Sequence, residues 1–338
     1  MASVREITFE LFREHGMTTI FGNPGSTELP MLAEFPDDFH YVLGLQEAVA
    51  VGMADGYAQA AGRTTHVNLH TAPGVGNGMG AIFNAQANHS PVVVTAGQQV
   101  RAQITMQANL TNRDATRVVH PFVKWSFEPP RAQDVPAALT RAIHSASLAP
   151  RGPAFVSLPM DDWTEEAGAE SSHLIERTTE PRMGPDPAAI ETLAQRLGAA
   201  SNPVLVAGPD IDAAGAWNDA VALAERQTLP VFASPAPGGG RLGFPEGHPL
   251  FQGVLPPAIG PVSETLKGRD LILVVGSSVF PYYPYIPGPL LPEGAGHLRL
   301  RDVPLAGARV SIEVEGDALA VRGVPPGLAV VRQRRDVQ

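Results

Sequence analysis

The turn at positions 23 to 26 is the first place in the chain where residue types and spacing could do chemistry. An apolar run, TTIFG, is followed there by Asn23, Pro24, Gly25 and Ser26. Pro24 fixes one backbone angle and Gly25 permits a left-handed one, so the turn would expose a hydroxyl and several backbone amides. We expect Ser26 to cap the helix that follows, with Glu28 in its first turn. An ordinary strand-to-helix turn explains these residues about as well as a ligand site does, but the location favours a ligand, because open α/β sheets bind ligands beyond the carboxyl ends of their strands.

Glu47 is the second candidate, because it directly follows a predicted strand and falls in the first turn of a predicted helix, EAVAVGMADGYAQAAG. The helix dipole favours a carboxylate at that position, so Glu47 also has an ordinary structural explanation. Small residues dominate the helix, which predicts tight packing and allows a subunit interface. A carboxylate at the start of such a helix would be partly shielded from water and could exchange a proton with a ligand.

His70 is the third candidate. It closes the run HVNLH and precedes a glycine-rich stretch, TAPGVGNGMG, which contains Asn77. A histidine at the carboxyl end of a strand is well placed as an acid or base, although a lone histidine more often just hydrogen-bonds its surroundings. The stretch GVGNGMG has the spacing of neither the Walker A loop nor the dinucleotide fingerprint, so by itself it predicts no phosphate site.

Composition excludes several other kinds of function. The 338 residues include no cysteine, are 44% hydrophobic and carry a formal charge of −10 at pH 7. This acidity disfavours a nucleic acid or an anionic membrane as partner and leaves a small molecule as the expected one. The lack of cysteine removes disulfides and thiol chemistry and suits a cytoplasmic location. No apolar stretch approaches the ~18 residues of a membrane span, and no nucleophile elbow, zinc helix or calcium loop occurs in the sequence.

The elements that must position these residues alternate along the chain. The β-branched runs TTIF, YVLGL, HVNLH, PVVVTA and AFVSLP are mostly separated by stretches long enough for a crossover helix, and the pattern resumes later with PVLVAG, LPVFAS and DLILVVGSS. This alternation predicts an α/β protein with two doubly wound parallel-sheet domains. We expect the domains at residues 1–163 and 186–294, a polar linker at 164–185 and an atypical tail at 295–338.

Several longer stretches together resemble a known family. They are FGNPGSTELP, LGLQEAVAVGMADGYAQA, NLHTAPGVGNGMGAI, HSPVVVTAGQQ, FVKWS and GPAFVSLPMDDW. In this order and spacing the chain, from position 1 to about position 292, resembles the thiamine-diphosphate-dependent 2-keto-acid decarboxylases, most closely their benzoylformate decarboxylase branch. The resemblance implies that the first domain binds the aminopyrimidine ring of the cofactor and that a middle domain follows. In that family a third domain holds the diphosphate through Mg²⁺, and the active site lies between the first domain of one subunit and the third domain of its partner.

The resemblance also implies a role for each candidate residue. Glu47 corresponds to the glutamate that hydrogen-bonds the aminopyrimidine and promotes its imino form. Ser26 matches a serine that contacts the substrate carboxylate, and His70 matches a histidine that transfers protons before the aldehyde leaves. The residues implied to shape the cofactor site are Asn23, Pro24, Gly25 and Asn77. The implied reaction is the non-oxidative decarboxylation of an aromatic 2-keto acid to an aldehyde and CO₂, in a homodimer or homotetramer that pairs through the first domain.

Two features depart from the family pattern. Tyr283, in SSVFPYYPYIPG, occupies the place of a second active-site histidine. A phenol cannot relay protons near neutral pH as an imidazole does, although it can donate a hydrogen bond to the substrate.

The sequence also contains no G-D-G pattern for the Mg²⁺-diphosphate ligands. We therefore expect a truncated or frame-shifted product in which the third domain is missing and which is inactive or very weak alone. The alternative is a noncatalytic module that pairs with a full-length homologue or with a separate third-domain partner. A nicotinamide-dependent dehydrogenase is disfavoured, because neither domain carries a dinucleotide fingerprint.

Overall fold

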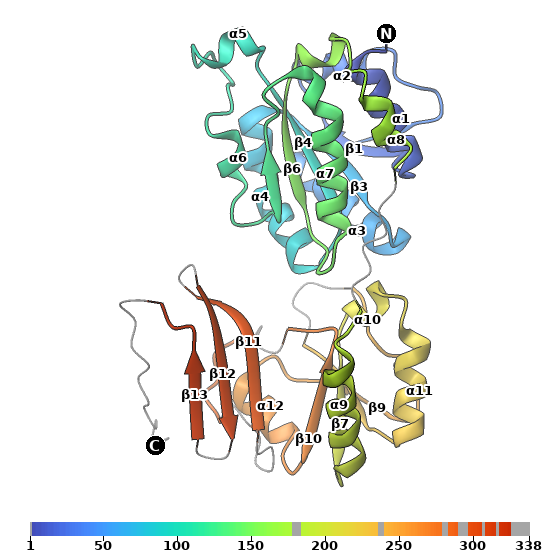
Figure 1. Cartoon of the computed structure of the whole chain (residues 1–338), viewed down its shortest axis with the longest axis vertical. Helices are drawn as coiled ribbons and strands as arrows, with labels where there is room; N and C mark the ends of the chain where they lie inside the picture. Colours follow the sequence, from blue (N-terminus) through green and yellow to red (C-terminus); the bar gives the residue numbers. More distant parts are fainter. Residues whose placement is uncertain are drawn as a thin grey trace. The chain divides into compact units, whose positions relative to one another are not determined.

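The computed structural model describes residues 2–177, 184–235, 240–278, 283–289, 297–305, 308–315 and 318–325. The chain divides into two compact units (Figure 1), the first comprising Met1–Gly184 with Gly238–Gly240 and the second comprising Pro185–Pro237 with Arg241–Gln338. Each unit has its own sheets and its own core. Among the described residues, no helix is both long enough and apolar enough to cross a membrane.

The first unit is built on a six-stranded parallel sheet with the strand order β2-β1-β3-β4-β6-β5. Its strands are β1 (Thr19–Asn23), β2 (His40–Leu43), β3 (Thr65–Leu69), β4 (Val92–Gln98), β5 (Trp125–Phe127) and β6 (Ala154–Pro159). Its helices are α1 (Val4–Glu14), α2 (Leu29–Leu32), α3 (Glu47–Ala61), α4 (Thr71–Ala87), α5 (Arg101–Ile104), α6 (Ala115–Val118), α7 (Val135–Ser147) and α8 (Ser171–Ile175), with short 3-10 turns at Ala132–Asp134 and Asp162–Thr164.

Helices cover both faces of this sheet (Figure 1). Helices α1 and α7 pack on one face and α3 and α4 pack on the other, and each face has its own buried apolar cluster. The central strands β3, β4 and β6 are buried along their whole length, as expected for a parallel sheet covered on both sides. This doubly wound arrangement brings the carboxyl ends of the strands to one edge, where the candidate residues follow β1, β2 and β3.

The amino-terminal helix shows how local sequence sets an element boundary. The Ser3 hydroxyl accepts a hydrogen bond from the backbone N–H of Glu6, and the Glu6 carboxylate accepts one from the backbone N–H of Ser3. This reciprocal pairing satisfies two donors that a helix start leaves open. Residues that follow the predicted first domain lie with the first unit as well, since the backbone N–H of Ala167 donates to the carbonyl of Ala2 and α8 packs against α1. The linker predicted over 164–185 stays a prediction.

The second unit contains a four-stranded parallel sheet and a separate antiparallel sheet. The parallel sheet has the order β10-β7-β8-β9, with β7 (Pro203–Ala207), β8 (Val231–Ala233), β9 (Phe251–Val254) and β10 (Leu271–Val275). Its helices are α9 (Pro187–Ala199), α10 (Asp210–Ala213), α11 (Trp217–Gln227) and α12 (Ile259–Thr265). The antiparallel sheet joins β11 (His297–Leu305), β12 (Ala308–Glu315) and β13 (Ala318–Arg322) in chain order. The two parallel sheets confirm the predicted fold class, whereas the sequence reasoning predicted no third sheet.

A histidine buried inside the first unit makes the stability of that unit sensitive to acid. His66 on β3 is fully buried, its Nε2 lies 2.8 Å from Thr95 Oγ1, and its ring contacts Phe12. Burial lowers the pKa of His66 to about 3, because the apolar surroundings disfavour the charged ring. In the unfolded chain a histidine titrates near pH 6.5, so the unfolded state takes up a proton at a pH where the folded state does not.

We therefore expect the unfolding free energy of the first unit to be highest above about pH 6.5. Because of His66 it should fall by about 1.4 kcal/mol per pH unit as the pH is lowered from there toward 3. His66→Gln keeps a polar side chain beside Thr95 but removes the titrating ring, so this variant should lose that part of the slope. Urea unfolding at a series of pH values measures both slopes. Equal slopes in the two proteins would show that His66 does not carry the effect.

Candidate active site

The turn after β1 presents Ser26 to solvent and buries the two residues that follow it. The side chains of Thr27 and Glu28 are each 1% exposed, whereas Ser26 is exposed. The prediction that Ser26 caps the next helix is wrong, because α2 begins at Leu29 with Glu28 at the N-cap and without a side-chain cap. Residues 26 to 28 form a turn before α2, and the Glu28 side chain accepts a hydrogen bond from the backbone of that turn.

The buried Glu28 carboxylate joins three segments of the first unit. Its Oε2 accepts a hydrogen bond from the backbone N–H of Gly25 at 2.8 Å, and its Oε1 accepts one from the backbone N–H of Gly97 at 2.9 Å. Thr27 Oγ1 donates to Oε1 at 2.7 Å. The negative charge acts beyond these partners, since burial and Glu28 together raise the pKa of Tyr41 above its usual range. From the sequence alone, Glu28 is expected only as a first-turn carboxylate, and this role is not predicted.

His70 lies between β3 and α4 and pairs with Glu28. Its Nδ1 is 2.9 Å from Glu28 Oε2 and 3.1 Å from Thr27 Oγ1, and the side chain is one-fifth exposed. The ring packs flat against the turn after β1, because a Cβ built on Gly25 would stand 2.2 Å from His70 Nδ1. Only glycine fits at position 25 for this reason. Thr71, directly after His70, is buried with φ at +40°, a backbone conformation that a β-branched residue rarely adopts and that is concentrated at functional sites.

Glu47 is the first residue of α3, and it is only 7% exposed. Its Oε2 accepts a hydrogen bond from Asn77 Nδ2 on α4 at 3.1 Å. A Cβ built on Gly74 would stand 3.2 Å from Glu47 Oε1, so the glycine lets α4 pack directly against the carboxylate without crowding it. Gly78 allows α4 to pack closely on α3 one turn later, where a Cβ would stand 3.8 Å from the Glu47 Cβ.

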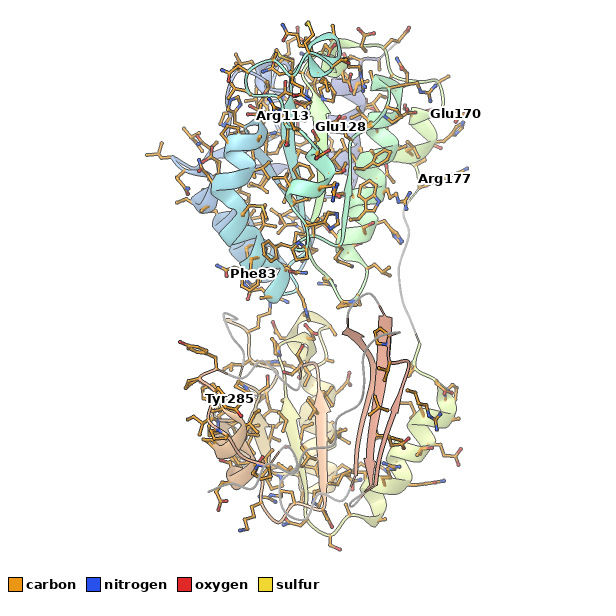
Figure 2. All side chains as sticks on the ribbon, turned by 90° about the vertical axis from the view of Figure 1, so that its left-hand side faces the viewer. Phe83, Arg113, Glu128, Glu170, Arg177 and Tyr285 are labelled. Atoms are coloured by element: carbon orange, nitrogen blue, oxygen red, sulfur yellow. The ribbon has the colours of Figure 1, made fainter. Side chains whose placement is uncertain are left out.

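The structure brings the three predicted residues of the first unit to the same edge of the sheet. Glu47 Oε1 and the His70 Cβ both lie within 3.4 Å of the point where a Gly74 Cβ would stand, so the two side chains are neighbours. His70 in turn contacts Gly25, the residue before Ser26. Tyr283 belongs to the second unit, where its side chain is 83% exposed and its backbone N–H donates to the carbonyl of Pro257. Figure 2 shows the neighbouring Tyr285 on the surface of that unit.

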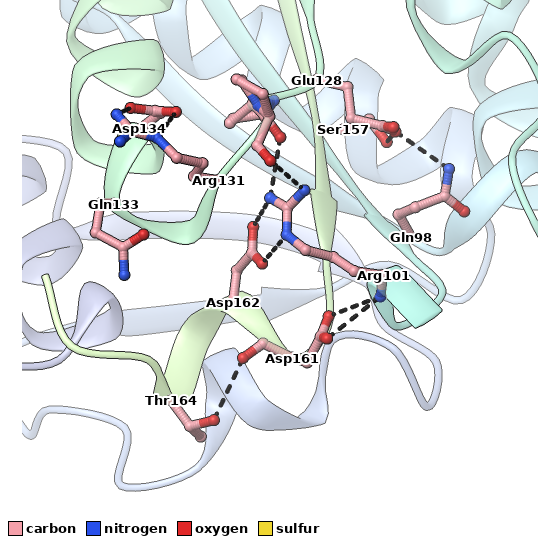
Figure 3. Close-up of polar contacts among 12 residues, drawn as sticks. Gln98, Arg101, Glu128, Arg131, Gln133, Asp134, Ser157, Asp161, Asp162 and Thr164 are labelled. Atoms are coloured by element: carbon pink, nitrogen blue, oxygen red, sulfur yellow. Dashed lines mark hydrogen bonds and ion pairs between the residues drawn. The ribbon is translucent and has the colours of Figure 1, made fainter. Parts of the chain in front are cut away.

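A second polar group fixes the carboxyl ends of β4, β5 and β6 beside this site (Figure 3). Gln98, fully buried at the end of β4, donates to Glu128 Oε2 at 3.1 Å, and the Ser157 hydroxyl donates to the same oxygen at 2.7 Å. The Arg101 guanidinium makes a bidentate pair with the buried Asp162, at 2.7 and 2.6 Å. It also donates to the carbonyls of two prolines, Pro129 and Pro130. These bonds anchor the segment that follows β4.

That segment borders a pocket of about 420 Å³. The pocket is lined by Ile104, Gln107, Thr111, Asn112, Arg113, Asp114, Ala115, Thr116 and Glu128, and Figure 2 shows Arg113 and Glu128 on the same side of the first unit. None of the predicted site residues lines it. Within the described part of the chain, no group of three or more histidine, aspartate and glutamate side chains could hold a metal ion.

Comparisons with known proteins match two parts of this chain to domains of one enzyme family. Residues 2–117 match the thiamine pyrophosphate enzyme N-terminal TPP-binding domain, and residues 190–294 match the central domain of the same enzymes. The chain is 51% identical over 319 residues to a benzoylformate decarboxylase of Pseudomonas aeruginosa, and the alignment covers 94% of this chain and 60% of the relative. An alignment of that length runs past residue 294, so part of the predicted tail aligns with the relative as well.

Solved structures give the same result. A thiamine diphosphate-dependent 4-hydroxybenzoylformate decarboxylase of Rhodococcus jostii matches with 51% identity and a TM-score of 0.84 over 87% of this chain and 55% of that one. A benzoylformate decarboxylase of Polynucleobacter necessarius matches with 47% identity and a TM-score of 0.83 over 87% of this chain and 54% of that one. The chain thus spans little more than half the length of these proteins. It belongs to the thiamine pyrophosphate enzyme family, of which it carries the N-terminal and central domains.

Proposed function

We propose that this polypeptide supplies the aminopyrimidine-binding half of a thiamine-diphosphate-dependent site that decarboxylates an aromatic 2-keto acid of the benzoylformate type. The observation that carries the proposal is the Glu47 carboxylate, which is buried, held by Asn77 through one oxygen and next to His70. The names of the relatives support the substrate class, because both are decarboxylases of a benzoylformate.

The Glu47 site fits an aminopyrimidine ring. Such a ring needs one acidic partner at a ring nitrogen, and the described residues provide Oε2 with a donor, Asn77, but offer no hydrogen-bond donor to Oε1. A side chain at position 74 would crowd Oε1, since even a Cβ there would stand 3.2 Å from it, so the glycine keeps that oxygen clear of a further side-chain contact. A carboxyl group enclosed in this way can hold a proton at the ring nitrogen or take it back, with little competition from water. When bound, thiamine diphosphate supplies the electron sink that allows a 2-keto acid to lose CO₂.

The neighbouring side chains suit the substrate end of the same site. We assign to the exposed Ser26 hydroxyl a hydrogen bond to the carboxylate of the keto acid, and to His70 the exchange of protons with the reacting oxygen. Asn23, Pro24 and Gly25 would form the wall beside them. Tyr283 is assigned to substrate binding by family resemblance, as a hydrogen-bond donor.

The other half of the site, which binds the diphosphate and Mg²⁺, is assigned to a third domain that lies outside these 338 residues. The 338 residues contain no G-D-G pattern, the family signature for the ligands of that ion. We therefore expect the 338-residue polypeptide, assayed alone with cofactor and Mg²⁺, to turn over benzoylformate very slowly or not at all. Robust turnover by the isolated polypeptide would overturn this part of the proposal.

Subunit complementation tests the proposed function directly. The Pseudomonas aeruginosa relative would be prepared with the residue aligned with Glu47 changed to alanine, so that its own sites are disabled while its third domain remains intact. Mixing it with this polypeptide, cofactor and Mg²⁺ should restore benzoylformate decarboxylation, because hybrid dimers would combine Glu47 from this chain with the third domain of the relative. Release of CO₂ and of the aldehyde measures the recovery.

The same mixture separates the catalytic proposal from its alternative. A noncatalytic module would form the hybrid, as seen by size-exclusion chromatography, and yet restore no turnover. Turnover that persists when Glu47 in this chain is also changed would show that the recovered activity does not come from the site described above.

A surface on α3 and α4 supports pairing through the first unit. Glycines on the outer sides of both helices, Gly52, Gly56, Gly76 and Gly80, have open space where a Cβ would stand. Large apolar side chains lie exposed around them, among them Leu45, Val49 and Phe83, with exposures of 89%, 53% and 49%, and Figure 2 labels Phe83. An apolar surface with gaps at backbone level suits another helix pair of the same kind. We propose that two copies, or one copy and a full-length homologue, pair through this surface.

Gly56→Arg is expected to convert the dimer to a monomer, because a long charged side chain would occupy the gap at the interface. Arginine is a better helix former than glycine by about 1 kcal/mol, so α3 itself should not be weakened. Sedimentation velocity measures the change. Gly198→Arg, at an equally open position on α9, is the matched control and should leave the oligomeric state unchanged. A dimer that survives Gly56→Arg would place the interface elsewhere.

A further inference from the structure

The Glu28–His70 pair contains chemistry that the proposed function does not use. Glu28 is 1% exposed, although a carboxylate is costly to bury unless its lone pairs are occupied. The two oxygens face the backbone N–H groups of Gly25 and Gly97, the hydroxyl of Thr27 and the ring nitrogen Nδ1 of His70. The hydrogen of a neutral His70 ring can lie on either Nδ1 or Nε2. Its position decides which ring nitrogen can accept a proton from a bound molecule.

The neighbours of His70 Nδ1 are hydrogen-bond acceptors. Backbone N–H groups can only donate, so each Glu28 oxygen presents lone pairs to its surroundings. The single hydrogen of the Thr27 hydroxyl points to Glu28 Oε1 at 2.7 Å, which leaves an oxygen lone pair facing Nδ1 at 3.1 Å. As an ionised carboxylate, Glu28 can only accept at Oε2, so the 2.9 Å contact between Nδ1 and Oε2 is a hydrogen bond when Nδ1 carries the hydrogen.

Close backbone contacts hold this arrangement in place. A Cβ on Gly97 would stand 2.0 Å from Glu28 Oε1 and 2.4 Å from Thr27 Oγ1, so β4 approaches the carboxylate as closely as a backbone can. Gly25 packs against the His70 ring, where a Cβ would stand 2.4 Å from Cε1. Among the described residues, no side chain or backbone group bonds the other ring nitrogen, Nε2, although the imidazole is one-fifth exposed.

We propose that Glu28 is a positioning residue that holds neutral His70 as the tautomer with its hydrogen on Nδ1. The bare Nε2 is then the only ring nitrogen available to a bound molecule, and it begins as a proton acceptor. His70 donates a proton only after it has taken one up at Nε2, and Glu28 then stabilises the positive charge of the ring. The catalytic meaning of this order rests on the proposed function, whereas the tautomer itself is a property of the free polypeptide.

Nuclear magnetic resonance of the full 338-residue polypeptide, labelled with ¹⁵N in its histidine rings, tests the tautomer without substrate or cofactor. The His70 signals are identified by their loss in His70→Gln, and the spectrum is recorded at a pH where the ring is neutral. We expect a protonated Nδ1 and an unprotonated Nε2, which differ clearly in ¹⁵N chemical shift. A protonated Nε2 in the unmodified polypeptide would overturn the proposal, whether or not any variant folds.

Three variants then identify the residue that sets the tautomer. Glu28→Gln should raise the share of the Nε2–H tautomer several-fold, because an amide replaces one acceptor oxygen by a donor. Thr27→Val should keep the Nδ1–H tautomer, since Glu28 Oε2 remains in place. Glu128→Gln changes another carboxylate of the same unit, one that contacts Gln98 and Ser157, and should leave the His70 signals unchanged. An unchanged tautomer in folded Glu28→Gln would assign the effect to other groups.

The complementation mixture separates this inference from the proposed function. Glu28→Gln in this chain should lower kcat about 10-fold to 100-fold with little change in KM, as expected for a residue that acts through the proton-transfer group. A mixture that shows no turnover while His70 holds the Nδ1–H tautomer would refute the proposed function alone. Turnover together with an Nε2–H tautomer would refute only the role of Glu28 and would leave the proposed function standing.

Discussion

Changing Glu47 to glutamine in this chain is expected to lower benzoylformate decarboxylation by the complementation mixture about 1,000-fold. The amide matches the carboxyl group in size and can still accept the hydrogen bond from Asn77, but it cannot exchange a proton with a ring nitrogen. Positioned proton transfer of this kind contributes ~10² to 10⁴-fold to enzymatic rates. Steady-state kinetics with saturating cofactor and Mg²⁺ measure the loss.

Two controls make the result interpretable. Glu47 sits at the first position of α3, where the helix dipole favours a negative charge, so the glutamine variant should lose ~0.5 kcal/mol of stability and no more. Asn77→Ala removes only the partner of Oε2 and should cost about 10-fold in kcat, because the proton-exchanging group remains. A Glu47→Gln variant that keeps most of its activity while folded would remove the basis of the proposed function.

Changing Arg101 to alanine is expected to destabilise the first unit by about 3 kcal/mol. Asp162 is 2% exposed, and the guanidinium is its bidentate partner, so the variant would leave a carboxylate buried without its counter-charge. The carbonyls of Pro129 and Pro130 would lose their donors at the same time. Urea unfolding followed by tryptophan fluorescence measures the change, because Trp163 is buried beside this pair.

The chain offers a matched control in Arg131. It makes a bidentate pair with Asp134 at 2.6 and 2.9 Å, but Arg131 is 71% exposed (Figure 3). Solvent screens an exposed pair of this kind, so Arg131→Ala should be almost neutral. Equal losses from the two substitutions would mean that burial of Asp162 does not set the energy of the pair.

Local patterns in the sequence predicted the elements of the fold well. The run HVNLH became β3 and PVVVTA became β4, because β-branched residues in short apolar runs fit a sheet that is buried on both faces. The start of α1 is also set by local sequence, since Ser3 precedes Glu6 at the spacing that pairs the two. Short strands at sheet edges were missed, among them β5 and β9, because three or four residues carry too little periodicity to be recognised.

The candidate site was less accessible to sequence reasoning where it depends on contacts between distant segments. Glu47 and His70 were predicted from their places at strand ends, and the structure makes them neighbours through the glycine at position 74. Glu28 was missed as a functional residue because its partners, Gly97 and His70, lie 69 and 42 positions away along the chain. Nothing in the local sequence distinguishes a carboxylate that points into the fold from one that starts a helix. The glycine of TAGQQ was the one available signal, since it lies within the observed strand β4, and a glycine inside a strand indicates a close backbone approach.

The close approach at positions 25 and 97 limits how this site can be redesigned. Even a methyl group at either glycine would overlap the imidazole or the carboxylate, so libraries that randomise the whole turn would yield mostly misfolded variants. The neighbouring Ser26 is exposed, so its side chain can be changed without disturbing the packing of the turn. Efforts to broaden the range of accepted acids should therefore concentrate diversity on that single position and keep its flanking frame unchanged.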